Sequence, residues 1–224
     1  MSGAWPPPER GSFADILPLL ERYHAYKGAG CLGDVWVCRD ERRRTVAGWV
    51  WFPPPPGAAL ATCPTCPAAV LALSRMVAIP KAERDWQISK PLRWIMLHGI
   101  DRGRWPVLLT YSDAGAGHLG TAYQASRWKR GHTVTRPVYE DEEGRRRSDY
   151  NNGKRTEGVR RVGETQITAW THRVCPPGQE EAHMVAHGWS RVPVPGKRWR
   201  SGSQAFTWTR QPQVEQVSLF GGLA

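Results

Sequence analysis

The sequence predicts a single-core α/β fold, built on a mixed central sheet with helices on both faces. Three observations support this prediction. Hydrophobic residues make up 40% of the 224 positions, an ordinary share for a globular chain. Apolar runs of strand length alternate along the chain with runs of helical periodicity. A strand, a helix and a second strand follow one another in the middle of the chain, which favours a parallel pair with a right-handed crossover.

A helix and an antiparallel hairpin are expected first. Ser12 is suited to an N-cap and precedes apolar residues at helical spacing as far as Leu20. Residues 34–39 and 45–52 are apolar runs on either side of a short polar turn, which predicts two paired strands. The prolines at 53–56 end the second strand, because proline cannot donate to a strand ladder.

A buried strand and a helix follow. Residues 69–79 form an apolar run that stops at Pro80, which is typical of a strand covered on both faces. Residues 83–98 have helical spacing and precede Gly99, a residue suited to ending a helix. Pro91 is expected near the first turns, where a missing N–H is tolerated.

The next segments run from a strand into a loop rich in charge. Residues 105–113 predict another buried strand, and residues 117–128 predict a helix that begins in a glycine-rich loop. Residues 130–161 are rich in Arg, Gly, Asp and Asn and hold few aliphatic side chains. A long loop is expected there, with a basic and mobile part at 136–161.

The rest of the chain is expected to close the domain. Residues 166–174 predict a strand, residues 180–189 a short helix and residues 203–210 a closing strand. The predicted organisation is a flexible N-terminal tail over 1–11, one catalytic domain over 12–210, and a C-terminal tail over 211–224.

The charge balance points to a polyanionic partner. The chain holds 31 Lys and Arg against 20 Asp and Glu, a net charge of +11, and the basic residues are interleaved with 12 Trp. Neutralised phosphates release counterions, and Trp offers flat faces to bases, so double-stranded DNA is the expected partner. The alternative is a charge that only aids solubility and Trp that belong to the core. No apolar run is long enough to span a membrane and no signal core begins the chain, so the cytoplasm of the host cell is expected.

The cysteines give little support for a metal. Five Cys is an odd count, which argues against a disulfide framework. Cys63 and Cys66 have the spacing of half a zinc site, but a complete site needs four ligands and no second such pair follows. Two ordinary thiols at a proline-rich turn are the favoured interpretation, and no metal is assigned.

The segment 110–128 carries the chemistry. Asp113 stands at the tip of a predicted strand, and at such carboxyl ends polar side chains project into ligand crevices. His118 and Tyr123 follow in the glycine-rich loop and the helix, where they are expected to line the same cleft. The alternative is that Asp113 only caps the loop and that Tyr123 belongs to the core.

These residues resemble a known family. The run 112–125, Ser-Asp-Ala-Gly-Ala-Gly-His-Leu-Gly-Thr-Ala-Tyr-Gln-Ala, is similar to the signature of the phage Mom proteins, and residues 73–79 resemble that family's other marked strand. The matching Arg, Asp and Tyr stand at Arg75, Asp113 and Tyr123. The resemblance covers residues 12–135 well. It is weaker over 165–210, where Gly188-Trp-Ser-Arg and Gly196-Lys-Arg-Trp resemble the family's closing basic strand.

The resemblance implies a fold and an activity. The fold is that of the GNAT acetyltransferases, and the activity converts adenine in phage DNA to N6-methylcarbamoyl (acetamido) adenine, which protects the DNA from host restriction. Asp113 would then hydrogen-bond N6 and draw off its proton, with His118 holding Asp113 or acting as the base. Tyr123 would donate a proton or stack on the base, and Arg75 would hold an anionic group. The family's Tyr or His pair after the first helix aligns with Tyr23 and His24.

The donor site is where the sequence departs from the family pattern. Acetyl-CoA or another acyl or aminoacyl donor is implied, with Ser112, Lys81 and Arg84 as the residues expected to meet it. The GNAT diphosphate loop is usually rich in glycine, whereas residues 80–86 here are Pro-Lys-Ala-Glu-Arg-Asp-Trp. This departure puts ordinary acetyl-CoA binding in doubt.

Two further sets of residues are assigned to macromolecular partners. The expected DNA contacts are basic residues of the loop and of the closing strand: Arg145, Arg146, Arg147, Lys154, Arg155, Lys197 and Arg198. In the C-terminal tail, Gln216, Leu219 and Phe220 resemble the short motif by which bacterial proteins dock on the replication sliding clamp. The alternative for this tail is that Leu219 and Phe220 fold back on the core.

Two other functions remain open at this point. One is a conventional GNAT acetyltransferase that acts on a protein or a small molecule, against which the missing glycines and the charge both count. The other is a DNA-binding protein without catalysis, which would have no use for Arg75 and Asp113 at strand ends.

Overall fold

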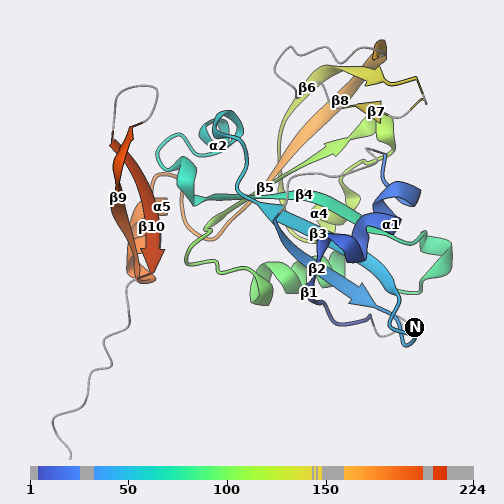
Figure 1. Cartoon of the computed structure of the whole chain (residues 1–224), viewed down its shortest axis with the longest axis horizontal. Coiled ribbons are helices and arrows are strands. Elements are labelled where there is room, and N and C mark those ends of the chain that lie inside the picture. Colours follow the sequence, from blue (N-terminus) through green and yellow to red (C-terminus); the bar gives the residue numbers. More distant parts are fainter. Residues whose placement is uncertain are drawn as a thin grey trace, which may run out of the picture.

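A large mixed sheet runs through the molecule and carries the other elements (Figure 1). The computed structural model describes residues 5–25, 33–142, 144, 146–147, 159–198 and 204–210, without the side chains of 147, 197–198 and 204–205. The eight strands of the sheet, in spatial order, are β1 (Glu9–Gly11), β2 (Asp34–Arg39), β3 (Thr45–Phe52), β4 (Val70–Ala78), β5 (Val107–Asp113), β8 (Arg160–Arg173), β6 (Lys129–Glu140) and β7 (Arg146–Arg147).

Short helices connect the strands, and a second sheet follows them. The helices are α1 (Phe13–Tyr23), α2 (Pro56–Thr62), α3 (Ser89–Trp94), α4 (Thr121–Ala125) and α5 (Glu180–Ala186), with shorter turns η1 (Pro67–Ala69), η2 (Lys81–Glu83), η3 (Ile95–Gly99, a π-helix) and η4 (Ala114–Ala116). Strands β9 (Trp189–Arg198) and β10 (Gln204–Arg210) form a separate antiparallel pair. The predicted mixed α/β class is confirmed. None of the helices in the described ranges has the length and apolar character needed to cross a membrane.

Strands β4 and β5 are parallel, as predicted, but their pairing is short. Only Val70, Leu71 and Ala72 pair with β5, and the last pair joins Ala72 and Leu109. Both strands then continue with other neighbours, so they part toward their carboxyl ends. At the first unpaired position, the Thr110 hydroxyl donates a hydrogen bond to the Leu73 carbonyl oxygen at 3.0 Å.

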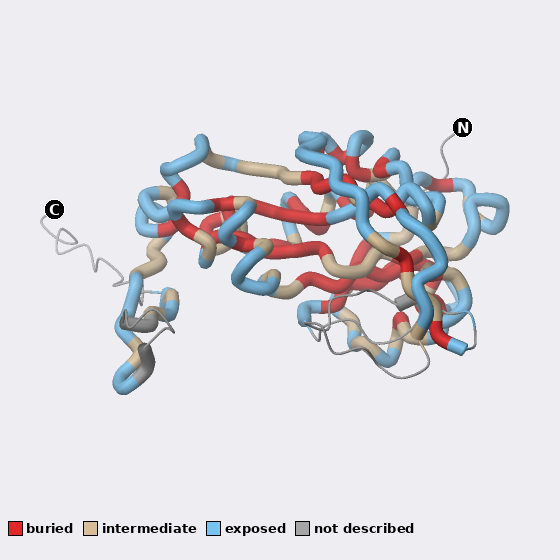
Figure 2. Tube along the Cα trace, turned by 90° about the horizontal axis from the view of Figure 1, so that it is seen from above, coloured by how far each residue is buried: buried red, intermediate tan, exposed pale blue. Residues whose placement is uncertain are grey.

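Helices cover both faces of the sheet, as predicted. On one face, Leu92, Ile95 and Met96 pack against tryptophans of the central strands. On the other face, Ile16 and Leu20 of α1 pack against valines of β2, β3 and β4. Buried segments therefore follow the middle of the sheet, and exposed segments its ends and connections (Figure 2). Six of the eleven tryptophans in the described part of the chain are buried: Trp36, Trp49, Trp51, Trp86, Trp128 and Trp170. Much of the tryptophan content thus serves the core rather than a base-stacking surface.

Strands occupy both ends of the predicted basic loop, and this is the main correction. Residues 129–140 form β6 and residues 160–173 form β8, and the two strands pair antiparallel. Apolar runs do not predict β6, because this strand is exposed at every residue from Lys129 to Arg136 and is mostly polar there. The remaining residues at 148–158 lie outside the described residues.

Other boundaries differ for local reasons. The helix predicted over 83–98 begins at Ser89, since η2 and an extended turn come first, and the helix predicted over 117–128 is shortened to α4. The segment predicted as a tail over 1–11 contains β1, which pairs with β2. The strand predicted to close the domain is β10, but it pairs with β9 outside the main sheet, because the helix expected to reach 189 ends at Ala186.

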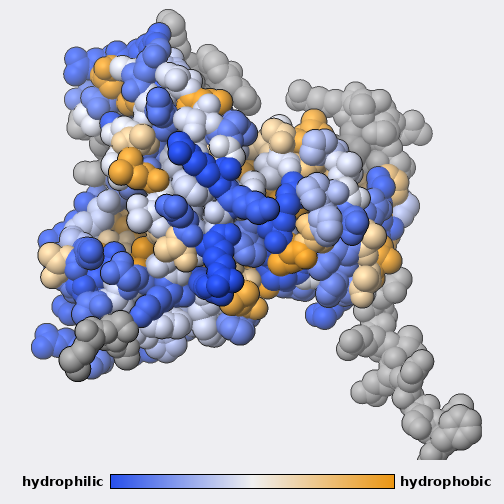
Figure 3. Space-filling model, turned by 180° about the vertical axis from the view of Figure 1, so that it is seen from behind, coloured by the Kyte–Doolittle hydropathy of each residue, from blue (hydrophilic) through white to orange (hydrophobic). Residues whose placement is uncertain are grey.

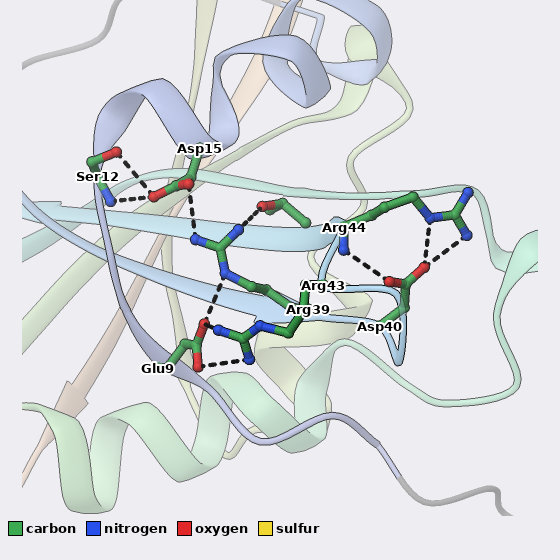
Figure 4. A network of polar contacts seen from close by, with 8 residues as sticks. Glu9, Ser12, Asp15, Arg39, Asp40, Arg43 and Arg44 are labelled. Atoms are coloured by element: carbon green, nitrogen blue, oxygen red, sulfur yellow. Dashed lines mark hydrogen bonds and ion pairs between the residues drawn. The ribbon is translucent and has the colours of Figure 1, made fainter.

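An ion-pair network fastens the N-terminal segment to the β2–β3 hairpin (Figure 4). The Arg39 guanidinium donates to Glu9 Oε1 and to Asp15 Oδ1, each at 2.8 Å. Asp15 also accepts a hydrogen bond from the backbone N–H of Ser12 at 2.7 Å, which ties the first turn of α1 to its N-cap. The bond from Arg39, followed by that from Ser12, lowers the pKa of Asp15 to about 2.

Replacing Gly48 with alanine is expected to destabilise the fold, because α1 approaches β3 at this glycine. A Cβ atom at Gly48 would lie 2.3 Å from Cγ2 of Ile16, which is fully buried. We expect Gly48→Ala to lower the free energy of unfolding by roughly 1–3 kcal/mol, as overpacked core positions do. Gly57→Ala is the control, since no atom lies within 4 Å of its added Cβ. Equal unfolding midpoints in urea for the two variants would contradict this packing.

Acid should weaken the network through Asp15. The pKa of this carboxyl is lowered in the folded state from 3.8 to about 2, so its contribution is present above pH 3.8 and disappears as the pH falls through about 2. Asp15 is partly exposed, so the contribution is expected to be about 1 kcal/mol. In Asp15→Asn, the free energy of unfolding should depend less on pH in this window, whereas Glu21→Gln, at an exposed position of α1, should follow the parent chain. An unchanged pH dependence in Asp15→Asn would exclude this role.

Candidate active site

Asp113 lies buried at the carboxyl end of β5, where the predicted strand tip is confirmed. The residue is 5% exposed, and its carboxylate accepts a short hydrogen bond from the Thr165 hydroxyl of β8. The Ala116 backbone N–H also donates to Asp113 Oδ1, at 3.3 Å, and Asp113 Oδ2 lies 3.6 Å from Nη1 of Arg146. A buried carboxylate needs such partners, because desolvating an unpaired charge is costly. Asp113 does cap the following turn, and it is held at the same time by an arginine and a hydroxyl.

The glycine-rich loop after β5 is fixed by its contacts. The Gly115 N–H donates to the Thr165 hydroxyl oxygen at 2.9 Å, and the Gly115 carbonyl accepts from Arg146 at 2.7 Å. Gly120 has φ +78°, and a Cβ there would lie 2.2 Å from the ring of Trp170. Glycine at this position thus meets both a conformational and a steric requirement. The loop is a well-defined structure rather than a mobile connection.

His118 stands beside the carboxylate and faces the end of α1. Its backbone N–H donates to the Asp113 carbonyl at 2.9 Å, and its ring lies 5.9 Å from the ring of His24 in an edge-on arrangement. His24 ends α1 and is buried, so the structure brings together His118 and the histidine that the sequence resemblance marks. The residue as a whole is exposed, yet crowding around its ring lowers the pKa of His118. Asp113 opposes this shift and Arg146 adds to it, so a neutral imidazole able to accept a proton is favoured at neutral pH.

Tyr123 does not share the pocket of Asp113, which corrects the single-pocket hypothesis. Its ring is 8% exposed and packs between Trp128 and Trp170, on the sheet face opposite Asp113. Its hydroxyl is hydrogen-bonded to Thr110, the residue that bridges to β4 where the strands part. Burial raises the pKa of Tyr123, so the phenol keeps its proton. A stacking role for Tyr123 needs an open ring face, which this packing does not leave.

The two strand ends carry the other predicted residues on different faces. Arg75 pairs with Val50, whose side chain packs against α1, so Arg75 lies on the α1 face together with Asp113. It is half-buried, and its guanidinium donates to the Ser74 carbonyl at 2.9 Å. Ser112 points the other way, since its hydroxyl accepts from the Trp170 indole at 2.9 Å in the core. Ser112 is therefore a core contact and does not line the α1 face.

The segment predicted to meet the donor does not form a glycine-lined cradle. Arg84 donates to the carbonyl oxygens of Ile79 and Trp86 and lies over the Trp86 ring at 5.0 Å, so its guanidinium fixes this turn. Backbone N–H groups of the turn are used internally, as in the bond from Glu83 to Pro80. Lys81 is exposed on η2. This turn does not fit the diphosphate of coenzyme A in the manner that the resemblance implies.

The structure describes only some of the basic residues assigned to DNA, and one of them has another partner. Arg146 was expected on the surface, but it turns inward to Asp113 and Gly115 because the buried carboxylate needs a counter-ion. The side chains of Arg147, Lys197 and Arg198 lie outside the described residues, although their backbones belong to β7 and β9. The residues wholly outside the described ranges are Arg145, Lys154, Arg155, Gln216, Leu219 and Phe220.

Cys63 and Cys66 are buried next to the start of β4. Burial raises the pKa of the Cys66 thiol to about 11, which disfavours the thiolate that a metal would bind. Within the described ranges, His, Cys, Asp and Glu side chains form no group of three or more that could hold a metal ion.

Sequence reasoning missed two residues of this site. Thr165 reaches Asp113 from β8, and Tyr111 lies exposed on β5 two residues before Asp113. The alternation of side chains along a strand could have placed Tyr111 beside Asp113. Nothing local marked Thr165, because its partner is 52 positions away in the chain.

Comparisons with known proteins add the following. No protein-family model and no curated protein sequence matches the chain. The structure is similar to an N-acetyltransferase from Staphylococcus aureus Mu50, with a TM-score of 0.49 and 10% identity over 75% of this chain and 98% of that one. It is also similar to a ribosomal-protein-alanine N-acetyltransferase from Brucella melitensis, with a TM-score of 0.47 and 14% identity over 75% and 99% of the two chains. At this level of similarity they assign neither a family nor an activity to the chain.

The electrostatics of the site can be measured at His118. Removing the charge of Asp113 in Asp113→Asn should lower the pKa of His118 further, because the carboxylate raises it. Removing the guanidinium in Arg146→Met should raise it, because that charge lowers it. The imidazole proton resonances, assigned with His118→Gln, report both shifts in an NMR titration. If neither variant moves this pKa, the three groups do not act on one another as described.

Proposed function

We propose that this chain is a DNA-modifying transferase that converts adenine in double-stranded DNA, at its exocyclic N6, to N6-methylcarbamoyl (acetamido) adenine. One observation carries the proposal. The Asp113 carboxylate and the His118 imidazole, whose pKa is lowered, lie together at the end of β5, on the face of the sheet that α1 covers. Both residues occupy positions that resemble the Mom signature. Such a modification would protect phage DNA from restriction.

The chemistry requires a proton acceptor next to a positioned amine. The N6 lone pair of adenine is delocalised into the ring, so the base must leave the stack and its amine must be polarised. Asp113 is held in place by Arg146 and Thr165, which suits it to accept a hydrogen bond from N6–H and to orient the amine. His118 then takes the proton that N6 loses when its new bond to carbon forms.

One other group would serve the donor side. Arg75 lies on the α1 face and provides a fixed positive charge for an oxyanion or an anionic group. Because the turn over 80–86 does not fit a coenzyme A diphosphate, the donor is proposed only as an acyl or aminoacyl compound.

Basic side chains of β6 would hold the DNA. Lys129, Arg130 and Arg136 are exposed on a strand whose outward residues are polar on both faces. Figure 3 shows strongly hydrophilic side chains in a band across one face of the molecule. Exposed basic side chains are the groups that contact phosphate. These contacts would position the duplex without reading its sequence. Docking of the C-terminal tail on the sliding clamp is a separate proposal that rests on the sequence alone.

Nucleoside analysis of DNA from cells that express the chain tests the function. A new adenosine species is expected by mass spectrometry in DNA from the parent chain. Asp113→Asn and His118→Gln should each reduce its amount by about 100-fold or more, as loss of acid–base groups does. Duplex binding should change little in either variant, because phosphate contacts dominate affinity.

Asp85→Asn provides the matched control, since Asp85 is an exposed carboxylate on the turn before α3. It should leave the modification unchanged. If no modified adenine forms, and purified protein instead acetylates a protein or a small molecule, the chain is a conventional acetyltransferase and the proposal is wrong.

A further inference from the structure

Leu119 is the most exposed large apolar side chain in the described part of the chain. It is 73% exposed, and no other such side chain there exceeds 57%. The residue lies in the loop between β5 and α4, directly after His118. Single exposed apolar residues are common on protein surfaces, so the meaning of this one depends on how it is held and on what surrounds it.

The backbone before Leu119 is fixed by hydrogen bonds. The four preceding N–H groups all donate to acceptors within the protein, at 2.9 to 3.3 Å: Gly115, Ala116, Gly117 and His118. Two of these bonds end on Asp113, one at its carboxylate and one at its carbonyl oxygen. Leu119 thus follows a run of backbone that has no free donor and a defined path.

The loop is also fixed at its two ends, on opposite faces of the sheet. Gly115 bonds Thr165, whose side chain lies on the α1 face with Asp113. A Cβ at Gly120 would lie 2.2 Å from the ring of Trp170, which belongs to the tryptophan-rich core of the other face. The loop therefore bends around the end of β5, and Leu119 faces solvent at this end of the sheet.

The strands with the exposed basic residues lie next to this loop. Thr165 of β8, which accepts the hydrogen bond from Gly115, pairs with Arg136 of β6. Arg136 is exposed, as are all the β6 residues before it. A duplex whose phosphates contact β6 can therefore lie against the end of β5. Proteins that open a base step combine cationic phosphate contacts with an apolar side chain inserted between the bases, and the two features adjoin here.

We infer that Leu119 is a wedge that inserts into the base stack of the duplex and fills the space that the target adenine leaves. The inference rests on the proposed function, because a base that is modified at N6 must leave the stack. It assigns the opening of the duplex to an exposed side chain and is independent of which group accepts the proton. A wedge needs apolar bulk at this position, so Leu119→Met should retain the role and Leu119→Ala should lose it.

Permanganate reactivity of thymines tests the wedge without a donor and without knowledge of the target sequence. Permanganate oxidises thymines that are no longer stacked, and the thymine opposite an extruded adenine is one of these. On a long end-labelled duplex, the parent chain should make thymines reactive at discrete positions. The added reactivity should fall by about tenfold or more in Leu119→Ala and stay within about twofold in Leu119→Met, since unstacking depends on the inserted side chain. Overall binding of the duplex should change by about twofold or less, because phosphate contacts dominate it.

Leu97→Ala is the matched control, because Leu97 is 54% exposed on η3, away from the loop, and its loss should leave the pattern unchanged. Thermal melting of each variant establishes that it is folded. An undiminished pattern in folded Leu119→Ala, or a parent chain that makes no thymine reactive, overturns the inference. Nucleoside analysis separates the two proposals. Modified adenine that forms equally in Leu119→Ala removes only the wedge, whereas reactivity that depends on Leu119 without modified adenine removes only the transfer reaction.

Discussion

The placement of β5 inside the sheet determines what the site can do. Its side chains alternate between two covered faces, so neighbouring residues of one short strand enter different environments. Thr110 and Ser112 point into the tryptophan-rich core, where they bond Tyr123 and Trp170. Tyr111 and Asp113 point to the face of α1. Because pairing with β4 stops at Leu109, the strand end is released from one neighbour while β8 still holds it. The end of β5 is thereby paired on one side, with β8, and unpaired with β4 on the other.

Much of the central sheet, and the position of Asp113 at a strand end, could be predicted from the sequence. The strands 34–39, 45–52 and 69–79 are apolar runs because they are buried, and such runs are visible without any partner. The same reasoning located Asp113 at a strand tip and His118 in the loop after it. It failed for Tyr123, because spacing along the chain does not tell which face of the sheet a short helix presents its residues to. α4 has only five residues, and it turns the phenol into the core.

Strand β6 and the contacts that depend on it could not be predicted, for a different reason. β6 is polar on both faces, so neither a period of two nor a run of aliphatic residues marks it. Its stability comes from pairing with β8, whose paired residues lie 20 to 42 positions later in the chain. A pairing of that range is invisible to local patterns, and so are the contacts that depend on it. Thr165 and Arg146 therefore became recognisable only once β8 and β7 were in place.

Burial of its ring is the main reason why the pKa of His118 is lowered, and Arg146 adds to that effect. The charge of Arg146 was expected to serve DNA, but it stands against Asp113 and binds the Gly115 carbonyl. Alone, the carboxylate would raise the pKa of His118, and alone, the guanidinium would lower it. Held as a pair, they oppose each other, and the burial of the ring decides the outcome in favour of the neutral form. Arg146 belongs to β7, which pairs with β6. The strand proposed to contact DNA therefore lies next to the strand whose arginine helps to lower the pKa of the proposed base.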